Sequence, residues 1–417
     1  MIAISLLMII ILILGFYMAW NIGSNDLANS MASAVGAKAI SLKTAVIFGG
    51  ILAFVGAVFV GSNVTDTIRK GIVDPEQIEN DLYIMYGAIA ALLGASFWIT
   101  VATWKELPIS TTHSIVGGMV GFGIVAGGVE IINWSKIGSV VASWAISPII
   151  GGILSYFIFK AIFRFILNKD EPLKAAKNVG PIFIGATFFI ISSSLFLKTP
   201  AGDKIGWSLG NFLLFSLLIG LISASIGRVL ILYFFKNNNI EDNQTGEEIY
   251  GKVEEIFRRL QIMTSCYVAF ALGANDVANA IGPMATAWSI EINGSVGSEV
   301  TIPFYLLILG GVGIAIGMAT WGYKVIKTIG TKITHLTNTR GFSIDFGAAT
   351  SVLLASKLGM PVSTTHAVVG AVIGVGLARG LEALDLSIIK KIIISWLVTV
   401  PIAALTTAGI FIVLINI

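Results

Sequence analysis

The sequence predicts an all-α membrane protein with about twelve transmembrane segments. Two observations support this fold class. Of the 417 residues, 56% are hydrophobic and only 12% are charged, and the mean hydropathy is +0.90. Soluble domains carry about 25% charged residues, so this chain cannot cover a surface that faces water. Long apolar runs also recur without the alternation of barrel strands, and backbone groups in lipid must then be satisfied within helices.

The apolar segments follow one another along the whole chain. In order they cover 2–37, 41–64, 81–104, 108–127, 133–167, 179–197, 204–235, 255–285, 301–328, 342–357, 361–380 and 385–416. The first is too long for one straight crossing and is expected to break near Asn21-Ile22-Gly23. A proline pushes the residue before it out of the helical region, so breaks are also expected at Leu107-Pro108 and Met360-Pro361. Each pair of segments around such a proline is either two full crossings or one re-entrant hairpin.

Basic residues predict the orientation. With strict alternation of the segments, one side collects about nineteen Lys and Arg residues and the other about six, and the crowded side is cytoplasmic. Both termini are then expected outside a cell inner or plasma membrane that the chain crosses many times. The polar stretch 236–259 becomes a short cytoplasmic connection. The only cysteine, Cys266, allows no intrachain disulfide and makes a thiol-ligated metal site improbable, and no cofactor is predicted.

Two motifs each occur twice. Asn21-Ile-Gly-Ser-Asn-Asp-Leu-Ala-Asn-Ser30 returns as Ala271-Leu-Gly-Ala-Asn-Asp-Val-Ala-Asn-Ala280, and Leu107-Pro-Ile-Ser-Thr-Thr-His-Ser-Ile-Val-Gly117 returns as Met360-Pro-Val-Ser-Thr-Thr-His-Ala-Val-Val-Gly370. The copies keep their order and are 250 and 253 residues apart. An odd number of crossings separates the copies, so the two halves have inverted topology, as in many secondary transporters.

The repeat divides the chain into three parts. Residues 1–167 are predicted to form the first inverted repeat and 255–417 the second. Residues 168–254 supply connecting helices and the short cytoplasmic loop. Broken helices or hairpins are expected to meet at a substrate site on the repeat interface, near the middle of the membrane.

Two aspartates lie inside apolar segments. Asp26 and Asp276 each cost roughly 2.5–3.5 kcal/mol to insert, and neither has a basic neighbour in sequence. One interpretation is a protonated or hydrogen-bonded structural residue. The favoured one is a sodium site, because neighbouring amides lie on adjacent helical turns and offer hard oxygen ligands. The predicted sodium ligands are Asp26, Asn25, Asn29, Asp276, Asn275 and Asn279.

Three consecutive hydroxyl residues follow each of the two prolines that mark a break, and they open an apolar helix. Helix capping explains part of this pattern, because Ser and Thr accept bonds from free N–H groups at a helix start. A helix start inside the membrane also offers N–H donors and a positive dipole end to an anion, and two such starts can face one oxyanion. The predicted phosphate ligands are Ser110, Thr111, Thr112, Ser363, Thr364, Thr365, Asn25 and Asn275.

Charge predicts cotransport. Monohydrogen phosphate beside two aspartates would place about four negative charges in one site, and two unit charges about 6 Å apart repel by about 3 kcal/mol at an effective dielectric of 20. Neither motif contains a basic residue, so co-bound cations are required. Amide and hydroxyl neighbours favour sodium, whereas a proton relay would use isolated carboxylates or titrating histidines.

Three further residues are accessory candidates. His113 and His366 follow the hydroxyl runs and are interpreted as packing residues rather than proton carriers. Asp345 is either solvated at the interface or an additional cation ligand. Glu106, next to Lys105, is expected at a wet position.

At these residues the chain closely resembles the inorganic phosphate transporter family, whose signatures are a Gly-Ala-Asn-Asp-Val-Ala-Asn run and a Pro-[Ile/Val]-Ser-x-Thr-His run in each half. The resemblance covers roughly 15–130 and 262–380 and includes Gly341-Phe342-Ser343-Ile344-Asp345, where the family usually has Glu at the last position. Ser24 and Leu27 depart from the signature without removing a polar group. The resemblance implies phosphate symport with Na⁺ or H⁺, an inverted-repeat fold and outward termini.

The predicted function is therefore import of inorganic phosphate with co-transported sodium by alternating access. The alternatives within the family are a proton-coupled phosphate or metal-phosphate symporter and a sulfate permease. An intramembrane aspartate enzyme would not explain duplicated hydroxyl runs, and an anion channel would favour basic rings that are absent from the motifs. The expected partners are phosphate, sodium and the lipid bilayer, with no nucleic acid; a homodimer is an option that the sequence leaves open.

Overall fold

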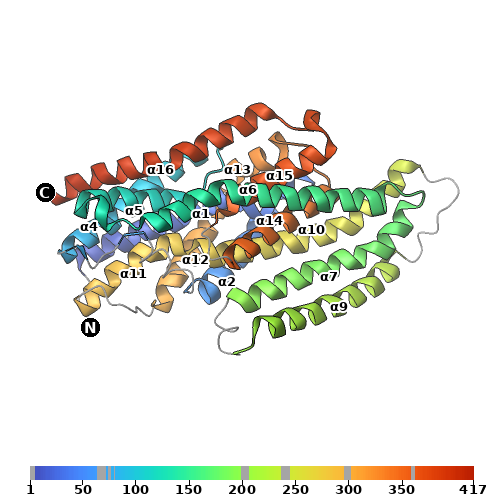
Figure 1. The fold of residues 1–417 in the computed structure, drawn as a ribbon, viewed down its shortest axis with the longest axis horizontal. Helices are drawn as coiled ribbons and strands as arrows, with labels where there is room; N and C mark the ends of the chain where they lie inside the picture. Colours follow the sequence, from blue (N-terminus) through green and yellow to red (C-terminus); the bar gives the residue numbers. More distant parts are fainter. Residues whose placement is uncertain are drawn as a thin grey trace.

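A computed structural model describes residues 5–62, 72–73, 77–78, 80–198, 206–235, 245–294, 302–357 and 362–417. This part of the chain is a long bundle of helices (Figure 1). The helices of the first half and the connection are α1 (Leu6–Gly36), α2 (Leu42–Val60), α4 (Asp81–Trp104), α5 (Thr111–Gly127), η2 (Val129–Ile131), α6 (Trp134–Ile162), η3 (Phe163–Leu167), α7 (Pro172–Lys198) and α9 (Leu209–Phe234). The remainder are α10 (Gly246–Asp276), α11 (Ala278–Asn293), α12 (Phe304–Thr320), α13 (Tyr323–Lys327), η4 (Thr328–Lys332), α14 (Asn338–Lys357), α15 (Thr364–Arg379), η5 (Leu381–Ala383) and α16 (Leu386–Ile415).

Each of the twelve predicted apolar segments overlaps at least one helix. Within the described residues, seven helices are long and apolar enough to cross a membrane. An eighth candidate is the bent pair of 304–320 and 323–332, which turns by 55°. Helices α5 and α15 are shorter, with 17 and 16 residues. The chain is thus a multi-pass helical membrane protein, while the number of twelve crossings stays a prediction.

The predicted break in the first segment is wrong. Helix α1 runs unbroken through Asn21-Ile22-Gly23 for 31 residues, and at 1.5 Å per residue it is about 46 Å long. A helix of this length fits the bilayer by tilting and by extending beyond the hydrocarbon. The second motif copy does break, between α10 and α11 at Val277. Pro283 follows six residues later and cannot donate to a preceding carbonyl, and the first copy has no proline at the corresponding position.

Two hairpins reach into the bundle from opposite ends (Figure 1). In the first, α4 and α5, Tyr83 near the start and Phe122 near the end both contact Phe411 of α16, with ring centroids 6.1 and 5.0 Å apart. In the second, α14 and α15, Arg340 near the start and Arg379 at the end both donate to the His335 carbonyl. Each hairpin therefore returns to the end where it entered. The expected break at Met360-Pro361 falls outside the described residues.

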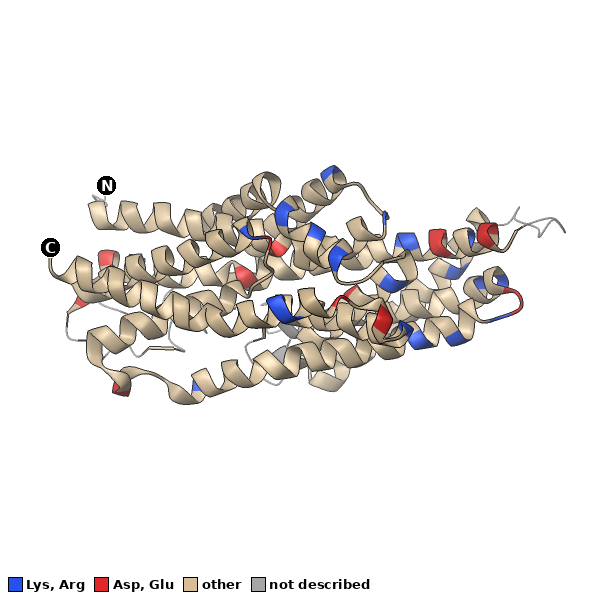
Figure 2. Cartoon of the chain, turned by 90° about the horizontal axis from the view of Figure 1, so that it is seen from above, with Lys and Arg blue, Asp and Glu red and all other residues tan. Residues whose placement is uncertain are grey.

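Both chain ends lie at one end of the bundle (Figure 1). Figure 2 shows that most Lys and Arg residues lie in the half of the molecule away from those ends. This separation is the charge asymmetry that the sequence predicts. The described helices of the connecting region, α7 and α9, pack against each other and α7 also packs on α10.

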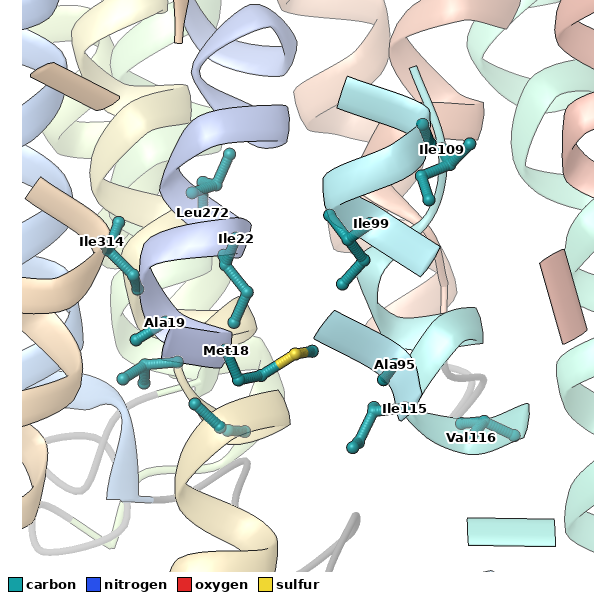
Figure 3. Packing of buried hydrophobic residues seen from close by; sticks show 14 of the residues in the cluster. Met18, Ala19, Ile22, Ala95, Ile99, Ile109, Ile115, Val116, Leu272 and Ile314 are labelled. Carbon is teal, nitrogen blue, oxygen red and sulfur yellow. The ribbon is translucent and has the colours of Figure 1, made fainter. Parts of the chain in front are cut away.

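Small residues bring helices of the two halves close together. A Cβ on Gly23 of α1 would lie 1.9 Å from the Ile314 carbonyl oxygen of α12, and a Cβ on Gly273 of α10 would lie 1.9 Å from the Ala53 carbonyl oxygen of α2. These two glycines occupy equivalent positions of the motif copies. Larger side chains fill the remaining space: Met18 extends from α1 toward Ala95 of α4 (Figure 3).

The Gly273 contact leads to a stability prediction. Gly273→Val is expected to lower the thermal unfolding temperature of the purified protein in detergent, because overpacking against backbone costs about 1–3 kcal/mol or more. Gly251→Ala in the same helix is the control, since no atom lies within 4 Å of the position that its new methyl group would take and alanine favours helix. Equal unfolding temperatures for Gly273→Val and the wild type would contradict the close contact.

Candidate functional site

The predicted polar residues of α1 are buried in the middle of the bundle. Asn25 and Asp26 are fully buried, and Asn29 is 1% exposed. The starts of α5 and α15, at Thr111 and Thr364, lie close to this part of α1. Residues predicted from four separate sequence stretches therefore meet at one place.

Asp26 is bonded to residues of both halves. Thr111 Oγ1 donates to its Oδ2 at 2.8 Å, and Asn29 Nδ2 donates to its Oδ1 at 2.8 Å. Thr365 Oγ1 also lies 3.5 Å from Oδ1. Asp26 has no basic partner among these contacts. Asp276 lies near enough for the two carboxyl groups to interact electrostatically.

The contacts of the second motif copy mirror those of the first. Asp276 accepts a bond from Thr364 Oγ1 at 3.4 Å, as Asp26 does from the equivalent Thr111. Asn279 Nδ2 donates to Thr112 Oγ1 at 3.1 Å. Each aspartate is thus bonded to a threonine of its own half.

The asparagines connect the halves. Asn29 of the first half donates to Thr365 Oγ1 of the second at 2.8 Å, while Asn279 of the second donates to Thr112 of the first. Thr365 in turn donates to the Ile109 carbonyl in the opposite hairpin tip at 3.0 Å. The site is therefore built across the interface between the two halves.

Asn25 makes hydrogen bonds that the sequence does not predict, while its role as a ligand stays a prediction. Its Nδ2 donates to Thr103 Oγ1 at 2.9 Å and to the Leu107 carbonyl at 3.1 Å, and its Oδ1 accepts from the Ile109 N–H at 3.2 Å. All these partners belong to the end of α4 and the tip that follows. Asn25 holds the first hairpin tip against α1, so its carboxamide is engaged within the protein.

Asn275 lies beside open space. It lines a small cavity of about 20 Å³ together with Thr364, enough for about one water molecule. Of the residues that correspond to the Asn25 partners, Met360 falls outside the described residues. Because Thr364 belongs to the second hydroxyl run, the cavity adjoins that run.

The serines of the hydroxyl runs are helix caps, as the capping interpretation predicts. Ser110 Oγ accepts from the His113 N–H at 3.2 Å, and Ser363 Oγ accepts from the His366 N–H at 3.3 Å. The threonine side chains that follow point to the aspartates and asparagines instead. Capping and site formation are thus divided between neighbouring residues of one run.

One buried oxygen atom, Asn29 Oδ1, is suited to bind a cation. Asn29 Oδ1 has no hydrogen-bond partner among the described residues, although its Nδ2 is engaged. A buried amide oxygen without a donor is costly, and a hard cation is a suitable partner for it. Asp26 Oδ1 accepts a bond from that same amide, so a carboxylate lies beside the unpaired oxygen. These oxygen ligands suit sodium chemically.

The histidines pack against aromatic rings. The His113 and His366 rings lie 4.9 Å apart, edge to face, and His366 stacks on Trp396 at 3.8 Å. His113 also lies 5.2 Å from the Trp144 ring. Both side chains are almost fully buried. This arrangement agrees with the packing interpretation.

Asp345 is not at a wet interface, so that half of its prediction is wrong. The residue is 2% exposed and accepts bonds from Ser33 Oγ at 2.6 Å, Ser265 Oγ at 2.5 Å and Thr264 Oγ1 at 3.5 Å. Ser33 is seven residues after Asp26 on α1, about 10 Å along the helix. Three hydroxyls from α1 and α10 thus surround a third buried carboxyl group, in addition to those of Asp26 and Asp276. Its use as an accessory cation ligand stays a prediction.

Other polar residues of the site are missed from the sequence. Asn21 Oδ1 accepts from Thr100 Oγ1 at 2.8 Å, and Thr100 is 2.6 Å from the Tyr17 hydroxyl. Thr103 bonds to Asn25. The threonines are separated by three residues on α4 and therefore share a face, which is the signal that could have revealed them.

Glu106 is exposed to solvent, as predicted, and forms an ion pair. Its carboxylate lies 2.5 Å from Lys332 Nζ, with the two side chains 42% and 35% exposed. The hydrogen bond from Lys332 is the main cause that holds the pKa of Glu106 below its ordinary value of 4.5, and the charge of Lys332 adds to it. The residue lies outside both neighbouring helices, between α4 and α5.

The ion pair leads to a pH prediction. Because the pKa of Glu106 is lowered on folding, its stabilisation is present above pH 4.5 and is lost as the pH falls through the lower folded-state pKa. We expect Lys332→Gln to cost about 0.2–1 kcal/mol at pH 7, the range for exposed pairs. The difference in unfolding temperature between wild type and variant should shrink at about pH 3. A difference that grows on acidification would reject the pair as its source.

Comparisons with known proteins find relatives that match along nearly the whole chain. A family model described as "Phosphate transporter family" matches residues 22–407. A protein of Pyrococcus abyssi with the name "Putative phosphate permease" is 52% identical over 404 residues, which are 97% of each chain. The Arabidopsis thaliana protein "Inorganic phosphate transporter 2-1, chloroplastic" is 40% identical over 94% of this chain and 70% of its own. A solved structure, "The sodium-dependent phosphate transporter", matches with a TM-score of 0.89 and 45% identity over 99% of this chain and 100% of that one.

Proposed function

Since this chain belongs to the phosphate transporter family, we propose that it imports inorganic phosphate together with sodium by alternating access. The observation that carries the proposal is the site itself: two buried aspartates, each contacted by a threonine at the start of a helix. The helix starts suit an oxyanion, and the carboxylates suit cations. We propose no enzymatic activity, and no cofactor beyond sodium as the coupling ion.

Electrostatics supports the coupling. Phosphate beside Asp26 and Asp276 adds negative charge to a site that already holds two buried carboxyl groups. Each close pair of like charges costs about 3 kcal/mol at 6 Å and an effective dielectric of 20. The hydrogen bonds given above for the two carboxylates come from threonine and asparagine side chains, which carry no positive charge. Sodium ions at Asp26, Asn29, Asp276 and Asn279 would offset this repulsion, and phosphate would bind at the threonine hydroxyls.

The paired geometry supports an inverted repeat. Equivalent residues make equivalent contacts, and the two hairpins open toward opposite ends. Under this proposal, 1–167 and 255–417 are the two repeats and 168–254 connects them. Their helices interleave, since α15 packs on α6 and α16 packs on α5. We place both termini outside, because the basic half of the molecule lies away from them.

The test is uptake of radiolabelled phosphate into proteoliposomes. An inward sodium gradient is expected to drive uptake, and replacement of sodium by choline should reduce it to background. Uptake that persists without sodium but follows a pH gradient would instead support proton coupling. A tenfold excess of sulfate should compete weakly, because near neutral pH it lacks the proton that phosphate can donate to a carboxylate. Equal competition by sulfate would reject phosphate selectivity.

A further inference from the structure

A second polar cavity lies outside the candidate site. It has a volume of about 510 Å³ and lies between the ends of α6 and α15 and the starts of α10 and α14. Its charged lining residues are three cations and one carboxylate: Lys160, Arg340, Arg379 and Glu254. We name this cavity the basic recess. It lies in the half of the molecule away from the chain ends, where basic residues gather (Figure 2).

The charges of the basic recess are not neutralised by one another. Arg340 and Arg379 are held together, because each donates Nη1 to the His335 carbonyl, at 2.9 and 3.2 Å. Glu254 is already engaged, since its two oxygens accept the Thr339 N–H at 2.8 Å and the Thr339 hydroxyl at 2.7 Å. Among the described residues, neither arginine nor Lys160 forms an ion pair with a carboxylate. The basic recess therefore presents an excess of positive charge.

An apolar groove continues from the basic recess. It has a volume of about 400 Å³ and runs between α6 and α15, which pack side by side. Tyr156 and Phe157 line the groove and Lys160 lines the recess, so the two adjoin within one turn of α6. From Pro148 to Lys160 the helix rises about 18 Å, close to the thickness of one hydrocarbon leaflet of about 15 Å.

We propose that the basic recess and the groove together bind one anionic phospholipid. Its phosphate headgroup would lie among Lys160, Arg340 and Arg379, and an acyl chain would follow the groove along α6 and α15. A free phosphate ion would use the same cations but would leave the groove unused, and the groove therefore favours the lipid. The basic end is also the predicted cytoplasmic end, where anionic lipids are attracted to basic pockets between helices.

The position of the groove gives the lipid a structural effect. Helix α15 forms one wall of the groove through Gly370 and Gly374, and its first residue is Thr364, which contacts Asp276. A lipid bound there would stabilise the packing of α15 on α6. This inference concerns binding and stability, and it does not depend on the transported ion.

The test is thermal unfolding of the full-length protein in detergent with added lipid. Phosphatidylglycerol is expected to raise the unfolding temperature by about 3–6 °C above an equal amount of phosphatidylcholine. The double variant Arg340→Gln/Arg379→Gln should lose most of this rise. Arg164→Gln is the matched control, because Arg164 lies directly after the end of α6 but does not line the recess. This variant should keep the rise in unfolding temperature. Retention of the full rise in the double variant would overturn the proposal.

Two further arms keep the test decisive. Lys160→Gln removes a recess cation that makes only a cation–π approach of 5.7 Å to Tyr156, so it should weaken the lipid effect even if the arginine variants fail to fold. Ile153→Trp should fill the groove, where Ile153 is 51% exposed, and reduce the lipid effect. If glycerol phosphate alone raises the unfolding temperature as much as phosphatidylglycerol, the recess binds a free anion and the lipid proposal fails. It fails as well if the Ile153→Trp variant changes the oligomeric state and leaves the lipid effect intact, because a second copy would then occupy the groove.

Discussion

Replacing Asp26 with Asn is expected to lower the initial rate of sodium-driven phosphate uptake by about 100-fold or more. Asparagine keeps the size of the side chain and can still accept the bond from Thr111. It removes the negative charge that a sodium ion needs, and loss of one partner of a buried charge pair costs about 3–5 kcal/mol. The measurement is radiolabelled uptake into proteoliposomes under an inward sodium gradient.

The matched control is Asp81→Asn, which removes an exposed carboxylate at the start of α4 and should leave uptake unchanged. A stability measurement separates lost binding from misfolding. In sodium-free buffer the Asp26→Asn protein should unfold at the same temperature as the wild type or above it, because the repulsion with Asp276 is removed. Sodium-driven uptake close to the wild-type rate in Asp26→Asn would reject the cation role of this residue.

Apolar run length and proline positions predict the helices well, because insertion into lipid constrains the length and polarity of each segment. They do not predict the course of α1. Its length suggests a break, but a tilted helix accommodates excess length, and only the second motif copy has a proline to disturb the backbone. Segment length alone thus does not distinguish a long helix from a broken one.

The candidate site is predictable as a set of residue types and less so as a set of contacts. The repeated motifs indicate that the aspartates and the hydroxyl runs belong together, and the structure brings Asp26, Thr111 and Thr365 into one cluster. Which residue bonds to which depends on how the hairpin tips cross α1, and no spacing along the chain contains that information. Asn25, for example, is predicted as a ligand from its motif, and its bonds to the first tip could not be predicted in this way.

Asp345 is a second residue whose contacts could not be predicted from the sequence. Its place near the start of an apolar segment allows both a wet and a buried position. Burial is decided by hydroxyls that lie 312 and 80 residues away in sequence, on Ser33 and Ser265. Such a partner set has no local pattern, so only the folded arrangement identifies it.

Replacing Thr365 with Val is expected to have the second-largest effect, a fall of about 30-fold in the maximal rate of uptake. The Thr365 hydroxyl accepts from Asn29 at 2.8 Å and donates to the Ile109 carbonyl at 3.0 Å, so one oxygen joins α1 and both hairpin tips. Valine has nearly the same shape but neither bond, and a buried polar group left without its partner costs about 1–3 kcal/mol.

Thr365→Ser retains the hydroxyl and is expected to restore most of the rate. If the hydroxyl acts only by joining the tips, the maximal rate should fall while the phosphate concentration for half-maximal uptake stays constant; if it also binds phosphate, both should change. A valine variant as active as the serine variant would show that the oxygen contributes nothing, and the cross-half contact could then not be part of the transport site.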